Sequence, residues 1–322
     1  MLSAQWEIER LTDLDECWYE ARSVAYAWQR AQAAHGDART PVGAVLGVGG
    51  GSMQLSTSFQ RGPDAGSMLP WIQQRKTTPG IDLPWSHAAP EPEEPASQPI
   101  SRLPSSLTPC VLDLGSVQGM ESLLHAIRND ADSPEERRHA WDDACARWRD
   151  HCTETVRAWI DEQGIKEHCA YKNWTGPLIM ISGTFYAGSA AGITKRDDLT
   201  ADIVLNAFSD SVEKNRAACP EFETETNGII AKAKAAAPDN FDEIKERAAA
   251  YKKTSKLAAR NVATMVYVSV LLDLLFERTI PVHFRRDWQL PGPPDQGTVP
   301  FRTTWTSGYF LDYVRLNGDE LA

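Results

Sequence analysis

Three consecutive glycines, Gly49, Gly50 and Gly51, separate two apolar stretches in GAVLGVGGGSMQLSTSF, residues 43–59. Each glycine costs backbone entropy and packs no side chain, so a triple glycine within a sheet needs a compensating role. One such role is a phosphate cradle, in which missing side chains let backbone N–H groups converge on an anion. The other is a plain tight hairpin. A dinucleotide fingerprint is excluded, because Ser52 takes the third glycine position and a strand follows.

The residues after the glycines alternate between polar and apolar, which predicts a strand. Ser52 and Gln54 then share one face of that strand, beside the glycine amides. A hydroxyl and a carboxamide placed there can bind a phosphoryl oxygen and orient a water molecule. The pattern alone supports the phosphate cradle and the plain hairpin about equally.

The elements that must position these residues alternate between strand and helix, which predicts an α/β fold. An amphipathic helix is expected over residues 5–33, and a long helix over about 134–163 with Ser133 as its N-cap. The apolar stretch 262–276 contains Asp273 and is too short to span a membrane, so it predicts a buried helix. Other expected elements are strands at CVLDLG and PLIMISG, a helix at MESLLHAIRN, and mostly helix after PLIMISG, broken by a loop at LPGPPDQG.

Ten of the chain's 20 prolines lie between Pro63 and Pro109. This segment has no periodic apolar residues, and proline removes backbone donors, so residues 61–107 are expected to be a disordered insertion. We expect residues 1–60 to supply a helix and the glycine hairpin, and residues 108–322 to complete the same lobe.

The net charge of −11 and the sequence pI of about 5.2 argue against binding to nucleic acid or to an anionic membrane. A phosphorylated ligand would have to be held by backbone amides, a metal ion or a local basic patch. The sequence has no CxxC or HExxH pattern, so it predicts no metal-binding residues. It shows no signal peptide and no membrane span, and it leaves the cellular location open.

The segment GVGGGSMQ resembles the second phosphate-binding loop of the apyrase-type nucleoside phosphatases, Asp-x-Gly-Gly-(Gly/Ala)-Ser-x-Gln. The related exopolyphosphatases usually have glutamate where Gln54 stands, so Gln54 favours nucleotides. Other apyrase motifs are matched in order by YEARSVAYAW (residues 19–28), HCAYKNW, ISGTFYAG, NVATMVYVSVLLDLL and TTWTSGYFLDY. The resemblance covers residues 19–313, apart from the proline-rich segment.

This resemblance implies an actin-like ATPase, or ribonuclease-H-like, α/β lobe with a mixed sheet and flanking helices. It implies phosphate binding by Gly49, Gly50, Gly51 and Ser52, and catalysis by Gln54, which positions water, and Glu20, which takes its proton. Tyr186 and Trp305 match the aromatic pair that stacks on the nucleobase. Without the resemblance, Glu20 would be an ordinary helix glutamate and the two aromatic residues would be core residues.

The implied activity is hydrolysis of nucleoside di- and triphosphates with a divalent cation, Mg²⁺ or Ca²⁺, to release inorganic phosphate. Two departures weaken it. Gly47 replaces the family aspartate that helps to hold the cation. Only about eighteen residues precede YEARSVAYAW, so we expect the C-terminal lobe alone of a two-lobed protein. The alternative is a catalytically inactive lobe that binds nucleotide or a protein partner.

One further acid invites a catalytic role. Asp113 in VLDLGS could be the aspartate of another phosphate loop, but the following SVQGMESLLHAI matches a family helix that packs against the lobe. Asp113 is therefore expected to be structural. Family members are often found in the secretory pathway or outside the cell.

Overall fold

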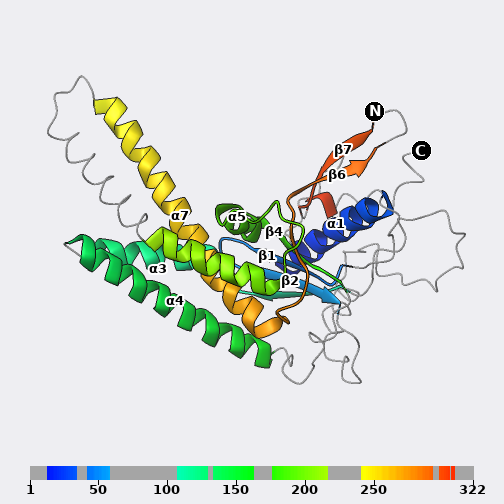
Figure 1. Cartoon of the computed structure of the whole chain (residues 1–322), viewed down its shortest axis with the longest axis horizontal. Helices are drawn as coiled ribbons and strands as arrows, with labels where there is room; N and C mark the ends of the chain where they lie inside the picture. Colours follow the sequence, from blue (N-terminus) through cyan, green and yellow to red (C-terminus); the bar gives the residue numbers. More distant parts are fainter. Residues whose placement is uncertain are drawn as a thin grey trace, which may run out of the picture. The chain divides into compact units, whose positions relative to one another are not determined.

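The computed structural model describes residues 13–34, 42–58, 107–129, 133–162, 176–216, 241–292, 297–304 and 306–308 (Figure 1). Contacts divide the chain into two units. Unit 1 contains residues 1–42, 56–109 and 287–322, and unit 2 contains residues 43–55 and 110–286. The one-lobe organisation expected from the sequence stays a prediction.

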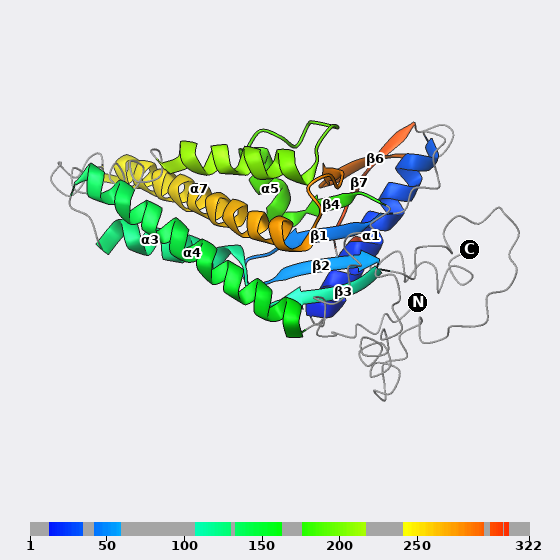
Figure 2. The same ribbon diagram turned by 60° about the horizontal axis from the view of Figure 1, so that its bottom comes forward.

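A five-stranded sheet has the order β3-β2-β1-β4-β5, and its neighbouring strands are seen side by side in Figure 2. The strands are β1 (Ala44–Val48), β2 (Met53–Ser58), β3 (Leu107–Leu112), β4 (Leu178–Ile181) and β5 (Val282–Phe284). β1 pairs with β4 and β4 with β5 in parallel. The short connection from β1 to its neighbour β2 requires an antiparallel pair, so the sheet is mixed.

This strand order, with helices packed around it, is that of a ribonuclease-H-type lobe. The predicted α/β class with a mixed sheet and flanking helices is confirmed. β3 begins at Leu107, the last residue of the expected insertion, and Pro109 is tolerated because β3 is an edge strand. The rest of the expected insertion lies outside the described residues.

The helices of unit 2 include α3 (Ser116–Asn129), α4 (Pro134–Glu162), α5 (Ser182–Ala190), a helix over residues 201–216 and α7 (Phe241–Leu275). They pack against one another, and α5 also packs against strands β1, β4 and β5 of the sheet (Figure 2). The predicted N-cap of α4 is confirmed. The Glu136 N–H donates to Ser133 Oγ and the Ser133 N–H donates to Glu136 Oε2, which is a capping box.

The predicted apolar core helix is the last part of α7. Its apolar residues from Val262 to Leu275 are almost all buried, because α3, α4 and α5 pack on them. The stretch Lys256–Leu275 is long and apolar enough to cross a membrane by length and composition alone, but much of it is buried within the protein. The burial fits the core helix expected from the sequence.

In unit 1, α1 (Asp13–Ala34) packs on a hairpin of β6 (Asp287–Pro291) and β7 (Thr298–Arg302). Trp28 meets Trp288 edge-on, with ring centroids 6.2 Å apart, and Tyr26 lies 5.5 Å from Phe301. The expectation of helix after PLIMISG is wrong here. Trp288 and Leu290 are buried between exposed neighbours, a period-two pattern, and the LPGPPDQG loop connects two strands.

Candidate phosphate-binding turn

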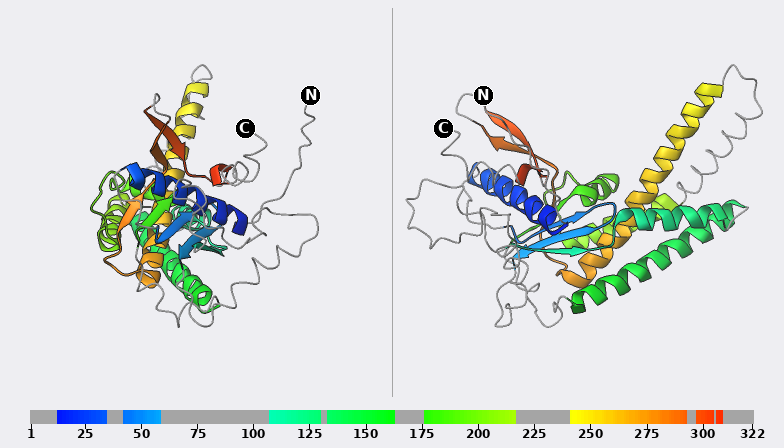
Figure 3. Two further views of the ribbon diagram at one scale, coloured as in Figure 1. Left: turned by 90° about the vertical axis from the view of Figure 1, so that its right-hand side faces the viewer. Right: turned by 180° about the vertical axis from the view of Figure 1, so that it is seen from behind.

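The triple glycine forms the turn between β1 and β2. The Gly49 N–H donates to the Ser52 carbonyl at 2.7 Å, which closes a four-residue turn directly after Val48. Figure 3 (right) shows this blue hairpin ending against the start of α3. The sequence-predicted residues Gly49, Gly50, Gly51, Ser52 and Gln54 therefore lie within one short segment at the carboxyl end of β1.

The first turn of α3 is fixed on the glycine turn by backbone and side-chain hydrogen bonds. The Ser116 N–H and Oγ donate to the Gly49 carbonyl at 3.1 and 2.9 Å, and the Val117 N–H donates to the Gly50 carbonyl at 3.0 Å. A Cβ on Gly115 would lie 2.2 Å from the Gly50 carbonyl oxygen. Only glycine fits at position 115, and this close contact holds the turn in place.

Gly51 differs from Gly115, because the described part of the chain gives no steric reason for a glycine at position 51. A Cβ built on Gly51 would meet no described atom within 4 Å. In the described residues the positive-φ glycines are Gly192 and Gly297, so Gly51 does not adopt the left-handed conformation that usually requires glycine. The open space beside Gly51 is what a ligand approaching the backbone needs.

Ser52, the residue directly before β2, contacts Gln54 within β2. Gln54 Nε2 donates to Ser52 Oγ at 3.0 Å, and the Gln54 side chain is only 6% exposed. The predicted shared face is thus observed, whereas the catalytic roles of both residues stay predictions.

The turn lies at a topological switch point of the sheet, between the neighbouring strands β1 and β4. From β1 the chain continues to β2 on one side, and from the adjacent β4 the sheet continues to β5 on the other. Ligands of α/β sheets bind at the carboxyl ends of strands at such a switch point. Val48 bridges to Ser182, the first residue of α5, and a Cβ on Gly183 would lie 2.2 Å from the Val48 carbonyl. The β4–α5 junction therefore adjoins the glycine turn.

Ser182 has φ = 54°, which is unusual for a residue other than glycine. Such strained residues concentrate at functional sites, where the surrounding structure imposes them. Its position at the carboxyl end of β4, next to Val48, adds a second irregular backbone segment to the switch point.

Tyr186 lies one turn along α5 from Ser182 and is 48% exposed, so it is not the core residue of the alternative interpretation. The guanidinium carbon of Arg286, just after β5, lies 5.5 Å from the centroid of the Tyr186 ring. An exposed ring with a cation on it can stack on a planar ligand. Trp305, its predicted partner, lies outside the described residues.

Arg260 of α7 is a residue at the turn that sequence reasoning missed. Its Nε donates to Ser116 Oγ at 2.9 Å, and its Nη2 would lie 3.9 Å from a Cβ on Gly50. No local motif marks this arginine, because its place at the turn depends on the packing of α7 against α3. Within the stretch VLDLGS, Asp113 was the candidate for a phosphate-loop aspartate. Gly115 and Ser116 are the residues of that stretch that contact the turn.

The predicted catalytic base, Glu20, is a buried residue of α1, with 8% of its surface exposed. It belongs to unit 1 and the glycine turn to unit 2, so its pairing with Gln54 stays a prediction. One helical turn before it, burial first and Asp13 second raise the pKa of Glu16. A raised carboxyl pKa makes Glu16 a second candidate for proton transfer.

The described residues hold no preformed cluster for the divalent cation that the resemblance implies, and that cation stays a prediction. They include no group of three or more His, Cys, Asp or Glu side chains that could hold a metal ion. Gly47, within β1, provides no carboxylate where the apyrase-type pattern has aspartate.

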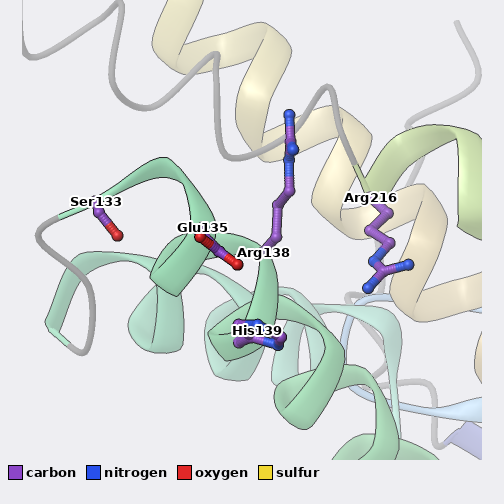
Figure 4. Close-up of a pocket in the computed structure, with 5 residues that line it drawn as sticks. All are labelled: Ser133, Glu135, Arg138, His139 and Arg216. Atoms are coloured by element: carbon purple, nitrogen blue, oxygen red, sulfur yellow. The ribbon is translucent and has the colours of Figure 1, made fainter.

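A surface pocket at the start of α4 is a separate feature (Figure 4). Ser133, Glu135, Arg138, His139 and Arg216 line it. Its basic character is largely neutralised, because Arg216 pairs with Asp142 and with Glu213. The capping box also occupies amides of the helix N-terminus that an anion would need, so this pocket is a weaker candidate than the glycine turn.

No protein-family model matches the chain, and no curated protein matches it in sequence. Among solved structures, the chain is similar to an exopolyphosphatase-like protein, with TM-score 0.43 and 11% identity over 97% of this chain and 69% of that one. It is also similar to the PPX-GPPA enzyme of Aquifex aeolicus, with TM-score 0.36 and 14% identity over 94% of this chain and 64% of that one.

The chain thus spans only about two thirds of the length of these two proteins. Neither is described as an apyrase, so the apyrase-type resemblance stays a prediction from the sequence. Similarities this distant assign neither a family nor an activity to the chain. The fold class stands on the strand order of the sheet itself.

Proposed function

We propose that this chain binds nucleoside di- and triphosphates with a phosphate at the β1–β2 glycine turn and supports hydrolysis of the phosphoanhydride bond. The observation that carries the proposal is the open space at Gly51, where no described residue packs and the backbone is not left-handed. Among the described residues, no backbone carbonyl accepts a hydrogen bond from the Gly50 or Gly51 N–H groups. These amides are available to phosphoryl oxygens.

The hydrogen bonds at Ser52 and Gln54 fit this chemistry. Ser52 Oγ accepts from Gln54, so its own hydroxyl hydrogen is left for a phosphoryl oxygen. The side-chain carbonyl of Gln54 can then accept a hydrogen bond from the attacking water. In the proposal, Glu20 takes the proton from that water as an in-line displacement proceeds.

The preference for nucleotides over polyphosphate rests on two residues. Gln54 is neutral where exopolyphosphatases usually have glutamate, and Tyr186 offers an exposed ring for a nucleobase. A base stacked on an aromatic side chain contributes roughly 1–3 kcal/mol, with little dependence on which base it is. We therefore propose broad nucleotide specificity.

The experiment is phosphate release from ATP, UDP and polyphosphate, each measured with Mg²⁺, with Ca²⁺ and with a chelator. Release from the nucleotides by the unmodified chain, lost in Gln54→Ala, is the expected result. Release from polyphosphate alone would replace the nucleotide assignment with the exopolyphosphatase one.

A second candidate function is nucleotide binding without hydrolysis, which Gly47 favours because a metal-holding carboxylate is missing there. Nucleotide binding in the absence of any phosphate release would support this candidate. Restoring release with Gly47→Asp would then show that the missing carboxylate is the cause.

A further inference from the structure

We propose that Arg260 binds the phosphate held at the glycine turn, so that a guanidinium provides positive charge at this site. The inference rests on the proposed function of the same turn. It concerns a side chain on α7, more than 200 residues from Gly51 in sequence.

Arg260 is held beside the turn by a two-step hydrogen-bond relay. Its Nε donates to Ser116 Oγ at 2.9 Å, and that hydroxyl donates to the Gly49 carbonyl at 2.9 Å. The relay holds the Nε side of the guanidinium beside the turn. An arginine positioned in this way loses little conformational freedom when it binds an anion.

Nη2 of the guanidinium also lies near the glycine backbone. Nη2 would lie 3.9 Å from a Cβ on Gly50, the same side of the turn that Val117 contacts. Of the five N–H donors of Arg260, only the one on Nε has a hydrogen-bond partner among the described residues. The Nη donors are therefore available to a phosphate, which guanidinium groups bind with two parallel hydrogen bonds.

The net charge of the protein favours a local cation at a phosphate site. A chain with net charge −11 repels phosphorylated ligands, and backbone amides alone carry no full positive charge. The described residues offer no metal-binding cluster as a substitute. Arg260 gives the turn a local positive charge that the overall composition does not predict.

A purely structural role makes a different prediction. If Arg260 only connects α7 to α3, then its removal should resemble the removal of its partner hydroxyl in Ser116→Ala. Both changes would lower thermal stability, and both would have the same effect on ligand binding. If Arg260 binds phosphate, Arg260→Met should weaken binding far more than Ser116→Ala, which leaves the guanidinium in place.

The experiment measures binding of inorganic pyrophosphate and of ADP by titration calorimetry, together with thermal unfolding. The variants are Arg260→Met, Arg260→Lys and Ser116→Ala, with Lys256→Met as the matched control. Lys256 is an exposed cation one turn earlier on the same helix. The loss of charge-assisted hydrogen bonds predicts about 10- to 100-fold weaker binding in Arg260→Met, with no change in Lys256→Met.

Arg260→Lys keeps the positive charge, so it tests the proposal even if Arg260→Met unfolds. It should bind pyrophosphate and ADP with intermediate affinity, because an ammonium group cannot make two parallel hydrogen bonds to a phosphate. Equal affinity of the unmodified chain, Arg260→Lys and Arg260→Met would overturn the inference while leaving the glycine turn as the ligand site. If the unmodified chain binds neither pyrophosphate nor ADP, the proposed function itself fails.

Discussion

The Nε2 of Gln54 in β2 donates a hydrogen bond at 3.0 Å to the Oγ of Ser52, the residue directly before that strand. This direction of donation leaves the hydroxyl hydrogen of Ser52 free to point toward the glycine turn. It also fixes the amide of Gln54, so that its carbonyl oxygen is the end left to contact water. The two side chains act together, and neither adds negative charge near a phosphate.

Ser52→Ala should lower both phosphate binding and stability. The change removes the proposed donor to the phosphoryl oxygen and leaves the buried Gln54 amide without its acceptor. An unsatisfied buried amide costs about 1–3 kcal/mol. Chemical denaturation and pyrophosphate titration of this variant measure the two effects. Unchanged binding and unchanged stability together would show that the Ser52–Gln54 contact is unimportant.

Tyr186→Ala should weaken ADP binding by about 5- to 150-fold, the stacking contribution expressed as an affinity, and leave pyrophosphate binding unchanged. Pyrophosphate has no base, so it reports on the glycine turn alone. Thermal stability should change little, because the ring is half exposed. Equal losses for both ligands would mean that Tyr186 supports the turn instead of contacting a base. Trp305→Ala is expected to behave like Tyr186→Ala.

Glu20→Gln should depress kcat for nucleotide hydrolysis by about 10²–10⁴-fold, the usual loss when a positioned proton acceptor is removed. Nucleotide affinity should be nearly unchanged, since the variant keeps the shape of the side chain. Steady-state kinetics and direct binding separate the two quantities. Hydrolysis at the parental rate would exclude Glu20 as the base and make Glu16 the next candidate.

Glu16→Gln should raise thermal stability at neutral pH. Burial and Asp13 raise the pKa of Glu16 in the folded protein above its usual value of 4.5. The folded state therefore holds the proton of the Glu16 carboxyl group more tightly than the unfolded state does. The stability gained from that protonation is lost as pH rises through the raised pKa. Melting curves from pH 4.5 to 8 should show an advantage of Glu16→Gln that shrinks toward the acidic end. A constant advantage at every pH would contradict the raised pKa.

The sequence predicted the features that depend on near neighbours in the chain. The N-cap at Ser133 and the buried end of α7 are predicted from residues within a few positions of one another. The hairpin at the glycines and the shared face of Ser52 and Gln54 follow from a period of two over a few residues.

The features that the sequence did not predict depend on long-range packing. Arg260 reaches the turn only because α7 packs on α3, and Gly115 needs to be glycine only because the turn lies against it. β6 and β7 were missed because their short alternating pattern lies on either side of a proline- and glycine-rich loop. The glycine pattern itself also could not separate a hairpin from a phosphate cradle, because the turn that forms is a hairpin in both cases.

The most direct test of the central claim compares Gly51→Ala with Gly115→Ala in stability and in pyrophosphate binding. A Cβ on Gly51 enters open space, so the free energy of unfolding should change by less than about 0.5 kcal/mol. The added methyl group should nevertheless block the approach of a phosphate to the backbone and abolish measurable pyrophosphate binding. Gly115→Ala is the control for damage to the fold, since its Cβ would overlap the Gly50 carbonyl and cost about 1–3 kcal/mol. A stable Gly51→Ala protein that no longer binds pyrophosphate is the predicted result. A stable Gly51→Ala protein that binds it as well as the unmodified chain would show that the triple glycine is only a hairpin.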